Sequence, residues 1–455
     1  MKLPYRFLSV LLSLIVVFSV CPQVMASDRG VRDDFVTIHY DIYKKYPAGV
    51  EGFIARLYDL VMGRSYDQEG LDYWKGQLDS GSMNASNIAR FFFSCDEYYS
   101  LGYSLDDYIT VLYKVFFDRK PDSEGFNYWK GLVLNNGKTR RDVLEGFINS
   151  QEWADVCIRF GVVSGTGVKP SYSVSRPQGV TDFVNSLYKD VLGRDADKSG
   201  LDFWCDSLTY MTNSAKSSAK GFFDSDEFKA LYKSKSDEDR VKVFYKVFLG
   251  REAEGDGLDY WKGQIKGKSV KDGISILFNG FVDSPEFADK CKKLGIIVNM
   301  PDPTPVYKAP SVITYTVETS SGTKSYTGYL DKELALNIMD ATNAYRVSLG
   351  LPELSVNKDL IKATDIRVVE LCYSFSHTRP NGGKFNSANP SCTANAENIA
   401  AGYGTMDASF VLNSWKNSSG HNKNMTSSYN SIGVSVFVPS GNTQYGSYFI
   451  QQFKY

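Results

Sequence analysis

Residues 57–74 read LYDLVMGRSYDQEGLDYW, and this pattern returns three more times along the chain. The later copies are LYKVFFDRKPDSEGFNYW at 112–129, LYKDVLGRDADKSGLDFW at 187–204 and FYKVFLGREAEGDGLDYW at 244–261. A second shared piece follows each copy, such as GFINSQEW from Gly146. Internal similarity of this kind indicates duplicated supersecondary units that bury their apolar surfaces against one another.

Each copy has the spacing of two helices. The apolar residues near its start recur with helical period. Asp67, Asp122 and Asp197 each precede a Gly by three residues, which predicts that their side chains cap the second helix. We therefore expect all-α structure with repeats one and two in 28–163 and repeats three and four in 180–298.

Repeat three permits a second interpretation. Asp195, Asp197 and Ser199 stand before Gly200, with Asp206 at the twelfth position, and this partly matches an EF-hand calcium loop. The other copies lack a ligand residue at the first or the twelfth position. The element that the copies share is Asp-x-x-Gly, so helix capping is our prediction and calcium binding is the alternative.

The aromatic pair that ends each copy, Tyr73-Trp74 in the first, also has two interpretations. A buried anchor for the helix is the one we favour, and a platform for stacking sugars is the alternative.

The bulk composition and the N-terminus bear on location. With 51 basic and 52 acidic residues, the 455-residue chain has a net charge of -1 and lacks the basic excess typical of a nucleic-acid binder. Residues 1–26 combine Lys2 and Arg6 with a short apolar run and end in Val24-Met25-Ala26, which predicts a cleavable signal peptide. The mature protein is expected to be secreted, without a membrane span, and in some settings associated with the cell wall.

Six cysteines remain after that cleavage, an even number that permits disulfides outside the cytoplasm. We predict a bond between Cys372 and Cys392, which would close a loop within one domain. The pairing of the other four stays open: Cys95, Cys157, Cys205 and Cys291.

The last third of the chain changes character. Residues 299–311 form a proline-rich linker that is expected to be stiff. Alternating residues in 312–330 predict a β-hairpin. Residues 331–455 combine helix patterns with two alternating strands and indicate a mixed α/β sandwich.

Two of the three histidines lie in this last domain. His377 and His421, with Glu397 between them in the sequence, could converge on Zn²⁺ or another divalent cation. They could equally form a base with its orienting group, or have structural roles only.

Both halves resemble known families. The repeats resemble a secreted bacterial helical repeat domain of unknown function, on the signature Leu-Tyr…Gly-Arg…Gly-Leu-x-Tyr-Trp. The C-terminal domain resembles the bacterial type of the CAP superfamily (SCP/PR-1-like), on NAYR at 343–346, SHTRP at 376–380, AENIA at 396–400 and the run Trp415-x-x-Ser-x-Gly-His.

The CAP resemblance implies an α-β-α sandwich with a surface cleft lined by two His and, in many eukaryotic members, two Glu. His377, Glu397 and His421 match three of those positions. Ser418 stands near the place of the second Glu, and Asn398 joins it as a further cleft candidate. The predicted fold class is thus an all-α repeat region followed by an α-β-α sandwich.

Three functions stay open, the first of them implied by the CAP resemblance. The first is a non-enzymatic binding or signalling CAP module, presented by helical interaction repeats, whose ligand is a lipid, a glycan, the cell wall or a protein. The second is a metal-dependent or acid–base extracellular hydrolase that uses His377, Glu397 and His421. The third is a structural or adhesive surface protein that acts through its repeats.

Overall fold

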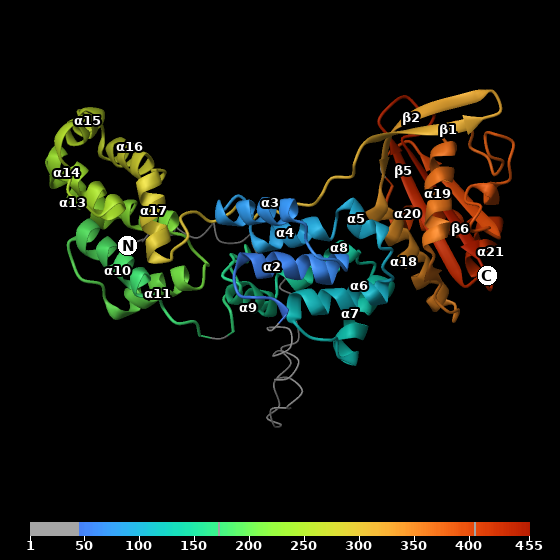
Figure 1. Cartoon of the computed structure of the whole chain (residues 1–455), viewed down its shortest axis with the longest axis horizontal. Helices are drawn as coiled ribbons and strands as arrows, with labels where there is room; N and C mark the ends of the chain where they lie inside the picture. Colours follow the sequence, from blue (N-terminus) through green and yellow to red (C-terminus); the bar gives the residue numbers. More distant parts are fainter. Residues whose placement is uncertain (1–44, 172, 405) are drawn as a thin grey trace, which may run out of the picture.

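A computed structural model describes residues 45–171, 173–404 and 406–455. The predicted signal peptide lies outside the described residues. The molecule has three lobes in a row: repeats three and four at one end, repeats one and two in the middle, and the C-terminal domain at the other end (Figure 1).

Repeats one and two are built from helices joined by short turns. They are α2 (Val50–Leu57), π-helical η1 (Tyr58–Met62), α3 (Gln68–Asp79), α4 (Ala85–Phe92), α5 (Asp96–Ser100), α6 (Leu105–Phe117), α7 (Ser123–Asn136), α8 (Arg140–Ile148) and α9 (Gln151–Arg159).

Repeats three and four follow the same plan around a second hydrophobic core. Their helices are α10 (Gln178–Ser186), η2 (Leu187–Val191), α11 (Lys198–Thr209), α12 (Ala215–Phe223), α13 (Asp226–Ser234), α14 (Asp237–Phe244), η3 (Tyr245–Leu249), α15 (Gly255–Ile265), α16 (Val270–Val282) and α17 (Pro285–Leu294).

The shared residues of the repeats hold each unit together, as repeat one illustrates. The Arg64 guanidinium lies 4.8 Å from the centroid of the Tyr58 ring. The Tyr58 hydroxyl lies so close to Gly70 that a Cβ there would clash with it, so this position admits no side chain. Asp67 accepts a hydrogen bond from the Gly70 amide at 2.8 Å and caps α3. The motif therefore encodes a cation–π contact, a close approach and a helix cap.

The other copies repeat these contacts. Arginine lies over tyrosine in all of them, at 4.8 to 5.1 Å, and each motif glycine meets a tyrosine hydroxyl. Asp122 and Asp197 cap α7 and α11, which confirms the predicted caps. Repeat four differs, because its Glu254 makes no cap hydrogen bond.

Residues 302–311, which we call the strap, run back along repeats one and two (Figure 1). The Asp302 carbonyl accepts a hydrogen bond from the Asn87 side-chain amide at 3.2 Å, and the Lys308 amide donates to Ser94 Oγ at 2.6 Å. The proline-rich stretch expected as a stiff spacer is thus docked on the protein over most of its length.

The C-terminal domain contains one mixed sheet. Its strands are β1 (Ile313–Thr319), β2 (Gly322–Leu330), β3 (Ser355–Val356), β4 (Ala396–Gly402), β5 (Ser431–Pro439) and β6 (Ser447–Lys454). The order is β1-β2-β5-β6-β4 with antiparallel neighbours, and β3 pairs with β5 in parallel.

Helices cover both faces of this sheet. On one face α18 (Lys332–Ser348), α20 (Ala408–Lys416) and α21 (Ser419–Thr426) enclose a core around Trp415. On the other face α19 (Lys358–Glu370) packs with Val368 and Val369 against β5 and β6. This three-layer arrangement, next to the helical repeats, confirms the predicted fold class.

The C-terminal domain is joined to repeat two by a buried ion pair. Arg140, at the start of α8, contacts both carboxylate oxygens of Asp340 on α18, at 2.7 and 3.0 Å. Both side chains are buried, at 5% and 6% exposure. A bidentate pair of this kind fixes the orientation of the two domains as well as their contact.

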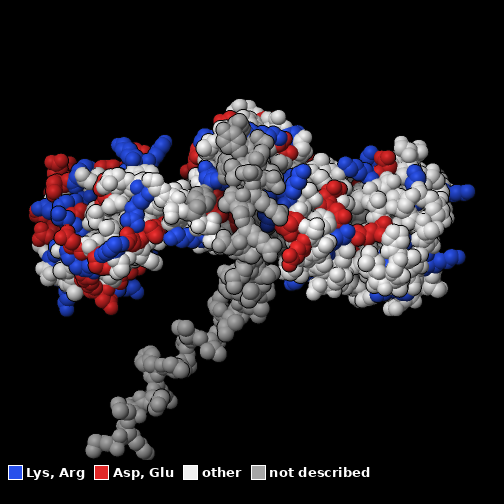
Figure 2. All heavy atoms as spheres, turned by 90° about the horizontal axis from the view of Figure 1, so that it is seen from below, with Lys and Arg blue, Asp and Glu red and all other residues white. Residues whose placement is uncertain are grey.

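The surface is mixed in charge. Figure 2 shows Lys, Arg, Asp and Glu crowded over the lobe of repeats three and four, whereas the visible face of the C-terminal domain is mostly uncharged. Within the residues that the structure describes, no helix is long and apolar enough to cross a membrane.

Candidate functional site

The candidate residues gather around β4, which lies at an edge of the sheet and pairs only with β6. Successive residues of a strand point to opposite faces. Glu397 therefore lies on the face covered by α19, and its neighbour Asn398 lies on the face covered by α18 and α21. The two residues that the sequence singles out as adjacent thus serve opposite sides of the same strand.

Glu397 is held by a network of charged and polar groups. Arg367 of α19 donates to its two oxygens at 3.1 and 3.2 Å, and Gln452 of β6 donates to Oε2 at 2.9 Å. Arg367 in turn pairs with Glu370 at 2.7 Å, and Glu370 pairs with Arg379. The result is a row of alternating charges that locks the carboxylate in place.

The electrostatics follow from this network. Burial favours the neutral acid and would raise the pKa of Glu397. The hydrogen bonds from His377 and Arg367, with the charge of Arg367, outweigh burial and hold the pKa of Glu397 below its ordinary value. Glu397 is therefore an ionised, fully paired carboxylate at neutral pH.

His377 lies at the surface end of the network. Its Nδ1 is 3.0 Å from Glu397 Oε1, and 54% of its side chain is exposed. A carboxylate on one ring nitrogen orients the imidazole and leaves the other nitrogen, Nε2, for contacts outside the network.

His421 lies on α21, close enough to His377 for the charge of one to act on the other. Burial lowers the pKa of His421, and repulsion from His377 lowers it further. Its backbone carbonyl accepts a hydrogen bond from the Asn398 side-chain amide at 3.1 Å, and Asn398 accepts one from Asn424 at 2.9 Å. Asn398 thus connects β4 to α21 through hydrogen bonds. Because it is wholly buried, its role is to position α21 and not to contact a ligand.

Ser418 occupies the N-cap position of α21, and its side chain makes no capping hydrogen bond. The structure places it three residues before His421 at the turn between α20 and α21. Ser418 is therefore close to His421 in sequence, at the N-terminus of the helix that carries this histidine.

The predicted metal set does not fit a metal. Both oxygens of Glu397 are already engaged by Arg367, Gln452 and His377, so the carboxylate has no lone pair directed at a cation. Among the described residues, no group of three or more His, Cys, Asp or Glu is arranged to hold a metal ion. In repeat three, Asp197 is engaged in capping Gly200.

The disulfide predicted between Cys372 and Cys392 is not formed, and both are free cysteines. Cys372 follows the C-terminal end of α19, whereas Cys392 Sγ lies 4.0 Å from Oδ1 of Asn357, the N-cap of that helix. The thirteen residues of α19 separate them by about 20 Å at the helical rise. A disulfide needs Cα atoms within about 7 Å.

Sequence reasoning missed Arg367, Glu370 and Gln452 as site residues. Arg367 and Glu370 are three residues apart on one turn of a helix, and both face the core, at 0% and 2% exposure. Charged residues at core positions of an amphipathic helix are the signal that could have found them.

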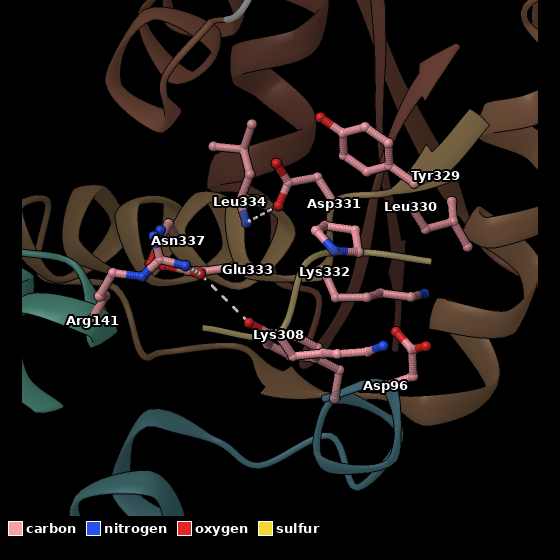
Figure 3. A pocket seen from close by; sticks show the side chains of 12 residues that line it. Asp96, Arg141, Lys308, Tyr329, Leu330, Asp331, Lys332, Glu333, Leu334 and Asn337 are labelled. Atoms are coloured by element: carbon pink, nitrogen blue, oxygen red, sulfur yellow. Dashed lines mark hydrogen bonds and ion pairs between the residues drawn. The ribbon is translucent and has the colours of Figure 1, made fainter. Parts of the chain in front are cut away.

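The protein also has a cavity away from the histidines. It has a volume of about 310 Å³ and lies between repeat two, the strap and the start of α18. Figure 3 shows Arg141 and Glu333 paired on one side, with Lys308 and Asp96 on another. The Arg141–Glu333 ion pair in its wall joins repeat two to the C-terminal domain.

Comparisons with known proteins agree with this architecture. The family described as Domain of unknown function (DUF4214) matches residues 42–102, 92–157, 177–232 and 219–291. The Cysteine-rich secretory protein family (CAP) matches residues 339–453, and both resemblances expected from the sequence are confirmed. No curated protein matches the chain.

Proposed function

Because the chain belongs to the DUF4214 family over half its length and carries a C-terminal domain of the Cysteine-rich secretory protein family, we propose that it is a secreted or surface-associated binding protein. In this proposal the C-terminal domain binds an extracellular ligand without catalysing a reaction, and the repeats present it. The N-terminal pattern of residues 1–26 supports export.

One observation carries the proposal: the Glu397 carboxylate is fully paired. A general base needs a free lone pair within reach of the proton that it removes. Arg367 and Gln452 occupy the oxygens of Glu397, and His377 takes a further contact. The carboxylate therefore acts as a fixed support that orients the exposed imidazole of His377 toward a ligand.

The second histidine fits the same role. The lowered pKa of His421 keeps its ring neutral at physiological pH, so the ring can both donate and accept a hydrogen bond. Together, the two imidazoles form a polar recognition site next to β4, the edge strand of the sheet.

The test is calorimetry on the full chain without residues 1–26, titrated with palmitate, cholesterol and soluble peptidoglycan fragments. We expect one probe class to bind. His377→Gln and His421→Gln each remove an imidazole nitrogen that would hydrogen-bond to the ligand. Each variant is expected to weaken binding about tenfold. Lys423→Ala, an exposed change on the same helix, is the matched control and should leave the affinity unchanged.

Failure of all three probes to bind, or equal binding by wild type and both histidine variants, contradicts the proposal for this site.

A second function is favoured by the 3.0 Å contact between His377 Nδ1 and Glu397. A carboxylate that orients an imidazole is the arrangement of an acid–base pair, with Nε2 of His377 as the base. The test is release of soluble products from peptidoglycan and casein. Turnover that is lost in His377→Gln and kept in Lys423→Ala would replace the binding proposal with an extracellular hydrolase.

A further inference from the structure

The residue before the motif tryptophan is exposed in all four repeats. This residue is Tyr or Phe in every copy, on the second helix of each unit. The exposed fractions are Tyr73 53%, Tyr128 43%, Phe203 62% and Tyr260 58%.

The other residues of the motif make contacts within their own repeat, whereas the residue before the tryptophan has a largely exposed side chain. The motif tyrosine, arginine, aspartate and glycine make the contacts described for repeat one. The tryptophans pack inward on phenylalanines of the following helix, with ring centroids 4.7 to 5.3 Å apart. Isolated exposed aromatics are ordinary in proteins. Four at one position of a duplicated unit require a common cause.

The geometry leaves each exposed ring available. Each contacts its neighbouring tryptophan edge-on, at 4.8 to 5.1 Å with interplanar angles of 73 to 78°. An edge-on contact uses the rim of one ring and leaves a flat face toward solvent. Trp129, Trp204 and Trp261 are themselves only half-buried, so three pairs present part of the indole as well.

The chemistry that the four positions share is the ring face. Phe203 lacks the hydroxyl of the three tyrosines, yet it is the most exposed of the four. What all copies retain is therefore a flat apolar surface and not a hydrogen-bonding group. The polar residues that precede the rings are engaged within the protein in at least two copies, because Asp202 pairs with Lys198 and Asp259 pairs with Lys262.

We propose that these four aromatic pairs bind an extended, neutral, β-linked polysaccharide, with a sugar ring stacked on each exposed face. The pyranose rings of such chains carry equatorial substituents and so offer flat C–H faces to an aromatic ring. The four positions share an apolar ring and no charged group of their own, so a neutral sugar is the ligand that fits all of them.

The test is depletion of the full chain without residues 1–26 by insoluble cellulose and by chitin. We expect binding to at least one of them. Loss of one ring should lower affinity roughly two- to tenfold. The variant Tyr73→Ala/Tyr128→Ala/Phe203→Ala/Tyr260→Ala removes every exposed ring and should lose binding to both polysaccharides.

Two controls separate stacking from other causes. Tyr73→Phe/Tyr128→Phe/Tyr260→Phe keeps every ring face and should bind as wild type. Tyr403→Ala removes an 84% exposed ring from the C-terminal domain and should have no effect. If the fourfold alanine variant does not fold, as judged by circular dichroism, the four single alanine variants provide the same comparison.

Absence of binding to both polysaccharides, or unchanged binding by the alanine variants, overturns the inference. Equal loss in the phenylalanine variant also overturns it, because the hydroxyls and not the ring faces would then be the ligands. The alanine variants leave the C-terminal domain unaltered and should bind the probe of the proposed function as wild type, so failure here and failure of the proposed function are distinguishable.

Discussion

Replacing Arg367 with methionine should destabilise the C-terminal domain strongly. The Arg367 side chain is fully buried between two carboxylates, Glu397 and Glu370, whose side chains are 0% and 3% exposed. Methionine fills much of the same volume but leaves both acids without their shared cation. Removing one partner of a buried ion pair costs about 3–5 kcal/mol. That is a large share of the roughly 5–15 kcal/mol by which a domain is stable.

The pH dependence gives a second, independent signature. The pKa of Glu397 lies below its ordinary value, so its ionised form stabilises the native protein, and this contribution is lost as pH falls through the lowered pKa. In Arg367→Met, Glu397 loses the hydrogen bonds and the positive charge of Arg367, which lower its pKa. Burial, which raises the pKa of Glu397, then dominates. Protonation then relieves the uncompensated charge, so the stability gap between wild type and variant narrows as pH falls.

Urea denaturation combined with hydrogen exchange of peptides from β4 and β6 would localise the loss to this domain. Lys362→Met is the control, because the Lys362–Asp359 pair is exposed and contributes about 1 kcal/mol or less. If Arg367→Met behaves like Lys362→Met, or if its deficit grows on acidification, the reasoning about the network is incorrect.

Three further predictions concern other parts of the chain. Asp340→Asn removes the charge that Arg140 faces across the domain interface and should split one calorimetric unfolding transition into two, since the coupling lost is about 3 kcal/mol or more; a single unchanged transition would count against a fixed interface. Asp197→Ala removes a helix cap and should cost about 1 kcal/mol in thermal unfolding, with no added effect of calcium or a chelator; stabilisation of wild type by calcium would restore the EF-hand interpretation. Cys372 and Cys392 are free, so a reductant should leave the melting temperature unchanged and both thiols should react with maleimide after unfolding; a shift on reduction would contradict this.

Local signals were predicted well from the sequence. The caps at Asp67 and Asp122 depend only on residues three positions apart. The repeats can be recognised because the same sequence pattern occurs four times. The contact of His377 with Glu397 could be expected only through the family resemblance, because twenty residues and a loop separate them in the chain.

Long-range features were not predicted. The prediction of a Cys372–Cys392 disulfide was wrong, because spacing in the sequence does not reveal that a whole helix separates the two thiols. The role of Arg367 was missed because its two carboxylate partners come from a helix turn and from a distant strand. The docking of the strap depends on asparagine side chains more than two hundred residues away, such as Asn87.

The strap gives the molecule a particular response to pulling. Repeats three and four are connected to the middle lobe by two chain segments, the strap being part of one of them (Figure 1). Asn87 contacts the strap at Asp302 and at Val306, and Ser94 contacts it two residues further on, at Lys308. Tension between the two end lobes would run along this row and load its hydrogen bonds together, in shear, instead of opening them one after another. A protein held at one end by a surface and at the other by a ligand would thus transmit force through its middle lobe without unravelling it.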